Sequence, residues 1–173
     1  MENKKYILCA LIPEFAIYSF IGWLYEELCE LVLIGKFSDR GFLTLPVCVI
    51  YGFFAIAVLR LFNRKRTRPT NVFLISLVMV TVMEYLSGLA IEGILGKPLW
   101  DYSMWICNFQ GRVSLISSLI FALACTALVF WVHPKLYEIF TQRLDKRAVV
   151  CIACFLVLIL SVDFFCNIAA SLV

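Results

Sequence analysis

The chain has 173 residues, of which 63% are hydrophobic and only 16% are charged, and its mean hydropathy is +0.95. This composition excludes a disordered chain, and a soluble domain of this length has too much surface to hide so many apolar side chains. The net charge of +3 by itself indicates little about the class of protein, and the positions of the charged residues are more informative. The composition therefore indicates an integral membrane protein.

Five apolar stretches are long enough to cross a bilayer, because a spanning helix needs about 20 mostly apolar residues. The connections between them are too short to hold a soluble domain. The sequence thus predicts an all-α integral membrane protein in which residues 1–173 form one compact bundle of five transmembrane helices. The predicted spans are Tyr6–Ile34, Phe42–Phe62, Val72–Leu95, Val113–Val132 and Ala148–Val173, with connections at Gly35–Gly41, Asn63–Asn71, Gly96–Arg112 and His133–Arg147.

Basic residues set the expected orientation. Eleven of the fifteen lysines and arginines lie at the N-terminus or in the second and fourth connections with their flanks, and four lie on the other side. Because basic connections stay in the cytoplasm, we expect a cytoplasmic N-terminus and a C-terminus outside. Glu14 interrupts the first apolar run and no small-residue cleavage site follows, so this span is expected to be an uncleaved anchor.

The third span carries acids that are costly in a membrane. A carboxylate near the bilayer centre costs about 3 kcal/mol or more, and such groups usually face the bundle interior and serve a function. At about 100° per residue, Thr81, Glu84, Gly88 and Glu92 fall within an arc of roughly 80°, so they form one polar strip with a glycine notch. Glu84 is expected near mid-span, whereas Glu92 fits either a site or the outer interface.

The first span carries a second group of acids in its outer part. Glu26 and Glu30 are one turn apart and share a face, whereas Glu14 points away from them. We expect Glu26 to approach Glu84 inside the bundle, since neither carboxylate can be left in lipid. Glu27 and Glu30 fit positions among the headgroups equally well.

Two further spans carry distinctive faces. Small residues on one face of the fourth span predict close helix packing. A polar strip runs along the outer half of the fifth span. The small face comprises Ser114, Ser118, Ala122 and Cys125, and the polar strip comprises Asp163, Asn167 and Ser171.

The connection Gly96–Arg112 is rich in aromatic residues from Trp100 onwards. Aromatic side chains at this depth lie in the interface or against the bundle and avoid solvent. We therefore expect this segment to fold over the acidic outer half as a lid, with Asp101 and Arg112 close to its mouth. Arg112, together with Lys36 or Arg40, would offset the repulsion among the acids.

Several kinds of chemistry are not expected. Gly35-Lys36 and Gly96-Lys97 are followed by Phe and Pro, so neither is a phosphate loop and the chain has no ATPase of its own. The single histidine, His133, falls at the cytoplasmic end of the fourth span, which disfavours a Ser-His-Asp triad, and one histidine excludes histidine-held zinc within one chain. No cofactor is expected, and a disulfide between Cys29 and Cys107 stays open.

A set of short motifs resembles a family of small bacterial membrane proteins, the CmpB-like ABC-transporter permeases. The motifs run from the first span to His133-Pro134; in the second span Leu45 stands where the family pattern has glycine, and the fifth span has no matching motif. The resemblance implies a multi-pass protein of the bacterial plasma membrane, a transport activity, and a separate ATPase subunit at the cytoplasmic connections. The matching residues are Tyr18–Trp23 with Glu26, Arg40–Leu43 with Pro46, Ile50–Gly52, Glu84–Leu86, Glu92, Trp100–Ser103 with Asn108, and Gly111-Arg112.

The sequence favours a transport protein or permease subunit that is not itself an enzyme, with a carboxylate-lined site in its outer half for a cation, a proton or a small polar solute. One alternative is an intramembrane enzyme acting on a lipid, in which carboxylates hold Mg²⁺ or act as acid and base. The other is a non-catalytic scaffold or regulator in which acids pair with arginines. The expected partners are the bilayer, an ATPase subunit and, as an open option, further copies of the chain, but no nucleic acid. The candidate site residues are Glu26, Glu30, Glu84, Glu92, Trp100, Asp101, Tyr102 and Arg112.

Overall fold

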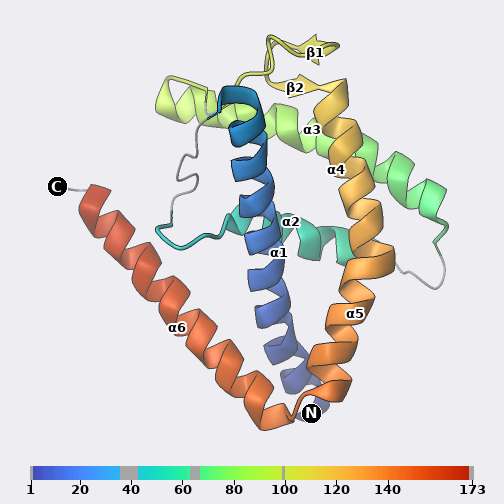
Figure 1. Cartoon of the computed structure of the whole chain (residues 1–173), viewed down its shortest axis with the longest axis vertical. Coiled ribbons are helices and arrows are strands. Elements are labelled where there is room, and N and C mark those ends of the chain that lie inside the picture. The colour runs from blue at the N-terminus through green and yellow to red at the C-terminus, as the bar shows by residue number, and fades with distance from the viewer. Residues whose placement is uncertain (1, 36–42, 63–66, 99, 172–173) are drawn as a thin grey trace. The chain divides into compact units, whose positions relative to one another are not determined.

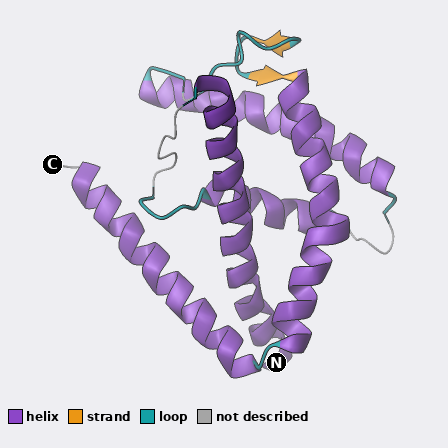
Figure 2. Cartoon of the chain, viewed as in Figure 1, coloured by secondary structure: helices purple, strands orange, loops and turns teal. Residues whose placement is uncertain are grey.

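The computed structural model describes residues 2–35, 43–62, 67–98 and 100–171. The chain within these ranges is almost entirely helical, with one short two-stranded ribbon (Figures 1 and 2). Lys36 and Arg40, expected to neutralise the acids, lie outside the described residues. The helices are α1 (Glu2–Ile34), α2 (Val49–Leu61), α3 (Pro69–Leu95), α4 (Leu115–Ala127), α5 (His133–Glu138) and α6 (Lys146–Ser171).

Within these described ranges, four helices are long and apolar enough to cross a membrane, and they correspond to the first, third, fourth and fifth predicted spans. They cover Tyr6–Leu31, Pro69–Ile94, Leu115–Arg143 and Lys146–Ala170. The prediction of an all-α membrane protein is confirmed to this extent.

The second predicted span, Phe42–Phe62, is helical only in part. Its helix α2 begins at Val49 and has 13 residues, and the described residues before it, Leu43–Cys48, are not helical. Pro46 accounts for the late start, because proline lacks an amide donor and disfavours a helical conformation at the preceding residue. The sequence prediction of one continuous helix here is corrected.

The fourth predicted connection, His133–Arg147, is also mostly helical. The helix that starts at Leu115 runs on to Arg143, through a π-helical turn at Leu128–Val132 (η1), then α5, and a second π-helical turn at Ile139–Arg143 (η2). The predicted span ends at Val132, but the helix continues through Pro134. The proline is tolerated because π-helical turns absorb the irregularity that a proline introduces.

The chain divides into two compact units, described here one at a time. The first comprises Met1–Ala57 and His133–Val173. Its core contains Ala10, Phe140 and Val149, so the start of α1, η2 and the start of α6 lie together (Figure 1). The Tyr6 hydroxyl donates to the Phe140 carbonyl oxygen at 2.6 Å and fastens this end of the unit.

Glycines let α1 and the start of α2 approach closely within the first unit. A Cβ atom on Gly22 would lie 2.2 Å from Cγ of Tyr51, and one on Gly52 would lie 2.3 Å from the Ser19 hydroxyl. The Cys48 amide also donates to the Ser19 carbonyl oxygen at 3.0 Å. Neither glycine can therefore be replaced without moving the chain.

The second unit, Val58–Val132, is built on α3 packed against α4. The small face of α4 is buried as predicted: Ser118 is 1% exposed, Ala122 0% and Cys125 5%. The Thr81 hydroxyl of α3 donates to the Ser118 hydroxyl at 2.9 Å. The strands β1 (Asn108–Phe109) and β2 (Val113–Ser114) pair antiparallel in the connection before α4 (Figure 2).

Candidate functional site in the second unit

The predicted polar strip of α3 faces α4 and the connection that precedes α4, here called the outer connection after its predicted side. Glu84, in the middle of this strip, accepts one hydrogen bond on each carboxylate oxygen. The Tyr102 hydroxyl donates to Oε1 at 2.8 Å, and the Ser117 hydroxyl lies 3.0 Å from Oε2. The strip is therefore the side of α3 that receives both the loop and the next helix.

Glu84 lies beside the first turn of α4. Ser114 caps this helix and forms a capping box with Ser117, whose amide donates to the Ser114 hydroxyl at 3.0 Å. The Ser117 hydroxyl also lies 2.9 Å from the Ser114 carbonyl oxygen, so its single hydrogen is shared between that oxygen and Glu84. A helix N-terminus carries a partial positive charge, which attracts a neighbouring carboxylate.

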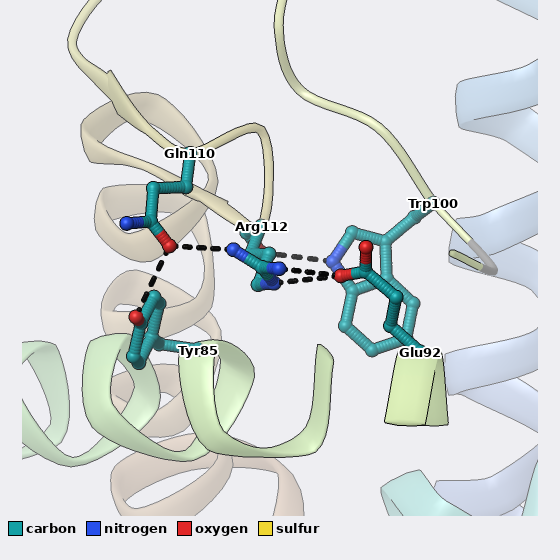
Figure 3. A network of polar contacts seen from close by, with 5 residues as sticks. All are labelled: Tyr85, Glu92, Trp100, Gln110 and Arg112. Carbon is teal, nitrogen blue, oxygen red and sulfur yellow. Dashed lines mark hydrogen bonds and ion pairs between the residues drawn. The ribbon is translucent and has the colours of Figure 1, made fainter. Parts of the chain in front are cut away.

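Arg112 pairs with Glu92 two turns further along α3. Its Nε and Nη2 atoms donate to Oε2 of Glu92 at 3.0 and 2.5 Å, and its Nη1 donates to Oε1 of Gln110 at 2.5 Å. Figure 3 shows the guanidinium between these two groups, with the Tyr85 hydroxyl donating to the same Gln110 oxygen at 3.2 Å. The predicted contact of Arg112 with a carboxylate is confirmed for Glu92.

Gly88 has no side chain, so it leaves space for the loop to pack closely against α3. A Cβ atom there would lie 3.3 Å from Cζ2 of Trp100 and 3.4 Å from Cβ of Arg112. The Trp100 indole N–H donates to the Arg112 carbonyl oxygen at 2.8 Å (Figure 3). The connection thus packs on the helix through Trp100, Tyr102 and Arg112, as the lid hypothesis requires of this unit.

Internal hydrogen bonds give the loop its own fold. Asp101 accepts from the Ser103 amide at 2.8 Å and from the Ser103 hydroxyl, and these bonds hold the pKa of the Asp101 carboxyl below its usual range. A Cβ atom on Gly111 would lie 2.6 Å from the same carboxylate, and Gly111 has the positive φ of 67° that glycine tolerates best. Asp101, a candidate site residue, uses these contacts to shape the loop.

The acids of α1 belong to the first unit. The Tyr51 hydroxyl donates to Glu26, and Glu30 is half-buried. Glu27 is only 1% exposed, so its side chain packs within the protein. Because Glu26 and Glu84 belong to different units, their predicted approach stays a prediction.

The polar strip of α6 secures the non-helical segment before α2. Oδ2 of Asp163 accepts from the Leu45 amide at 3.1 Å, and the Asn167 side-chain amide donates to the Thr44 hydroxyl at 3.1 Å. The sequence predicted this strip but not its partner, because an apolar run gives little sign of a break in the helix. Pro46 was the available signal.

Sequence reasoning missed a cluster around the single histidine. His133 was placed away from the outer glutamates, but its Nδ1 lies 3.0 Å from Oε2 of Glu14, an acid nearer the other end of α1. Tyr18 completes the cluster. The signal that could have found it was Glu14 itself, an acid inside an apolar span without an assigned partner.

Neither a metal cluster nor a disulfide is found in the described part of the chain. No group of three or more His, Cys, Asp or Glu side chains there is arranged to hold a metal ion. Cys29 and Cys107 are both free thiols.

Comparison with known proteins gives one match. The family model described as "Putative ABC-transporter type IV" matches residues 14–168. No curated protein and no solved structure matches the chain significantly.

Proposed function

Because the chain belongs to the ABC-transporter type IV family, we propose that it is a permease subunit in the bacterial plasma membrane that binds a cation, a proton or a small polar solute at Glu84. The observation that carries the proposal is the placement of this carboxylate. It sits in the interior of a membrane-length helix, beside a helix N-terminus and under the Tyr102 hydroxyl. Acids kept at such a depth usually serve transport or proton transfer.

A five-span topology with the N-terminus inside is part of this proposal. The helix α2 supplies about 20 Å of rise and the six residues Leu43–Cys48 supply up to about 20 Å more, so together they can cross a hydrocarbon core of about 30 Å. Non-helical backbone is tolerated at membrane depth only where protein groups satisfy it, as Asp163 does for the Leu45 amide. Interrupted helices of this kind are common at transporter binding sites.

The outer connection would act as the lid of the Glu84 site. Tyr102 and Arg112 join it to Glu84 and Glu92 of α3, and Trp100 fills the notch at Gly88. A solute entering from outside would displace Tyr102 from Glu84 while Arg112 keeps the loop attached.

An ATPase partner would bind at the cytoplasmic end. Lys135 and Arg143 lie on the helix that continues beyond the predicted fourth span, so this end presents a helical surface. In this account the chain itself catalyses no reaction, and the energy for transport comes from the partner or from an ion gradient. Assembly with further copies of the chain is compatible with the same arrangement.

A scaffold or regulator is the second candidate. The Arg112–Glu92 ion pair favours this function, because a carboxylate that is paired with a guanidinium holds the loop on the helix. Under this function Glu84 would also be structural, and its replacement would change stability without changing any flux.

Reconstituted vesicles test the choice between these functions. The full chain is placed in liposomes that contain a pH-sensitive dye, and proton flux is followed under gradients of Na⁺, K⁺ or Mg²⁺. We expect flux with one of these ions, a loss of at least about tenfold in Glu84→Gln, and no change in Glu138→Gln, whose acid is half-exposed and paired with Arg143. Wild-type flux that persists in a folded Glu84→Gln protein would contradict the assignment of Glu84.

A further inference from the structure

The first unit contains a buried carboxylate–phenol–imidazole cluster that the proposed function does not use. Oε2 of Glu14 lies 3.1 Å from the Tyr18 hydroxyl and 3.0 Å from Nδ1 of His133, and the hydroxyl lies 3.1 Å from the same nitrogen. Glu14 is 1% exposed and Tyr18 4%, whereas the His133 side chain is 28% exposed. The cluster is therefore closed on the α1 side and open at the histidine.

The three heavy atoms allow one consistent arrangement of hydrogens around an ionised Glu14. Oε2 can only accept, the Tyr18 hydroxyl has one hydrogen to give, and an Nδ1 without hydrogen would oppose the carboxylate with its lone pair. Nδ1 must therefore carry a hydrogen and donate it to Glu14. The contacts of His133 thus leave Nε2 as the nitrogen on which a proton can be gained or lost.

The second oxygen of Glu14 adds an independent observation. Oε1 is buried and has no hydrogen-bond partner among the described residues. A buried acceptor without a donor costs about 1–3 kcal/mol, more when it is charged. A protonated imidazole compensates for this charge, because the pair then has no net charge. Loss of the Nε2 proton leaves a net negative charge on the buried pair.

The titratable groups Tyr137, Glu138 and Lys146 on the neighbouring elements make contacts of their own. On α5 the Tyr137 ring packs against the His133 ring with centroids 5.9 Å apart, and Glu138 pairs with Arg143 of η2. On α6 Lys146 lies over the Tyr6 ring. In the part of the chain that the structure describes, His133 is the one basic side chain within ion-pair distance of Glu14.

We propose that Glu14, Tyr18 and His133 form a proton-binding site that holds one exchangeable proton on Nε2 of His133, with Nδ1 bound to hydrogen in both states. In the protonated state an imidazolium faces the Glu14 carboxylate. When the Nε2–H bond breaks, its proton leaves to water and the neutral imidazole keeps the same hydrogen bond to Glu14. The site changes its charge by one without changing its contacts, and it does not depend on the role of Glu84.

The single histidine makes this proposal testable by ¹⁵N magnetic resonance of the full chain in lipid nanodiscs, because every imidazole signal comes from His133. Over the pH range in which the protein stays folded, we expect the Nε2 signal to titrate while Nδ1 keeps its hydrogen throughout. Glu14→Gln should abolish the fixed tautomer and give a mixture of Nδ1–H and Nε2–H forms after deprotonation. The matched control Glu138→Gln should behave like the wild type.

Two results would overturn the proposal. One is a neutral His133 that carries its hydrogen on Nε2 in the wild type, and the other is an imidazole that does not titrate at all.

If Glu14→Gln fails to fold, Tyr18→Phe provides the second variant. It removes one donor to Glu14 but keeps the histidine contact, so the Nδ1–H form should persist, and its loss would likewise refute the assigned arrangement.

Discussion

Replacing Arg112 by lysine keeps the charge but removes the geometry that fastens the outer loop. Arg112 makes three charge-assisted hydrogen bonds, two to Glu92 and one to Gln110. Lysine can point one ammonium at Glu92 but cannot serve both groups, so at least one bond is lost and the two-pronged contact becomes single. Hydrogen bonds of this kind contribute about 1 kcal/mol each, and the half-exposed Glu92 reduces this through solvent screening.

The expected cost of Arg112→Lys is therefore about 1 kcal/mol for holding the loop, and about 2 kcal/mol for Arg112→Ala. These values correspond to a rise in the open population of about fivefold and about thirtyfold. Hydrogen–deuterium exchange measures this opening at three amides that the loop protects, those of Tyr102, Arg112 and Leu115. The control is Lys97→Ala, which changes an exposed residue before the loop. Exchange in Arg112→Lys equal to that of the wild type would show that Arg112 only anchors the helix, and the lid reasoning would fail.

Three other predictions follow from separate features of the chain. Gly22→Ala should lower stability by about 1–3 kcal/mol in a thermal unfolding assay, because its Cβ would lie 2.2 Å from Cγ of Tyr51. The control Gly93→Ala should be neutral, because no atom of the described residues lies within 4 Å of its Cβ. Equal stabilities of the two variants would refute the close approach of Tyr51 to Gly22. Hydrogen bonds from Ser103 hold the pKa of Asp101 low, so they stabilise the loop turn above the ordinary carboxyl range, and this stabilisation is lost as the pH falls through the lowered pKa. A ¹³C titration of the Asp101 carboxyl should show a higher midpoint in Ser103→Ala. An unchanged midpoint would contradict Ser103 as the cause. A cysteine at Thr67 in a cysteine-free chain should react only with reagents that reach the cytoplasm, and labelling from outside intact cells would overturn the topology.

The contacting face of α3 in the second unit can be predicted from the sequence, because the period of a helix decides which residues share a face. Thr81, Glu84, Gly88 and Glu92 were placed on one face by angle alone, and each contacts α4 or the outer connection. The loop's own fold was beyond such reasoning. It depends on positive φ angles at Cys107 and Gln110, residue types that give no local sign of that conformation.

The first unit was less predictable because its key contacts join segments far apart in the sequence. Helical arithmetic correctly turned Glu14 away from Glu26, and the two acids do take different partners, His133 and Tyr51. The partner of Glu14, His133, lies on the helix that starts at Leu115 and continues past Val132. That continuation uses a π-helical turn, and no pattern in the sequence announces one.

Equilibrium cation binding to the full chain tests the central claim, that Glu84 is the binding group, most directly. Isothermal titration of nanodisc-embedded protein with Na⁺, K⁺, Mg²⁺ or tetramethylammonium should reveal one class of site whose affinity weakens as the pH is lowered, because a proton competes for the same carboxylate. In Glu84→Gln the affinity should fall at least about tenfold, equivalent to about 1.4 kcal/mol, while Glu138→Gln should bind as the wild type does. Binding that is unchanged in a folded Glu84→Gln protein would contradict the account.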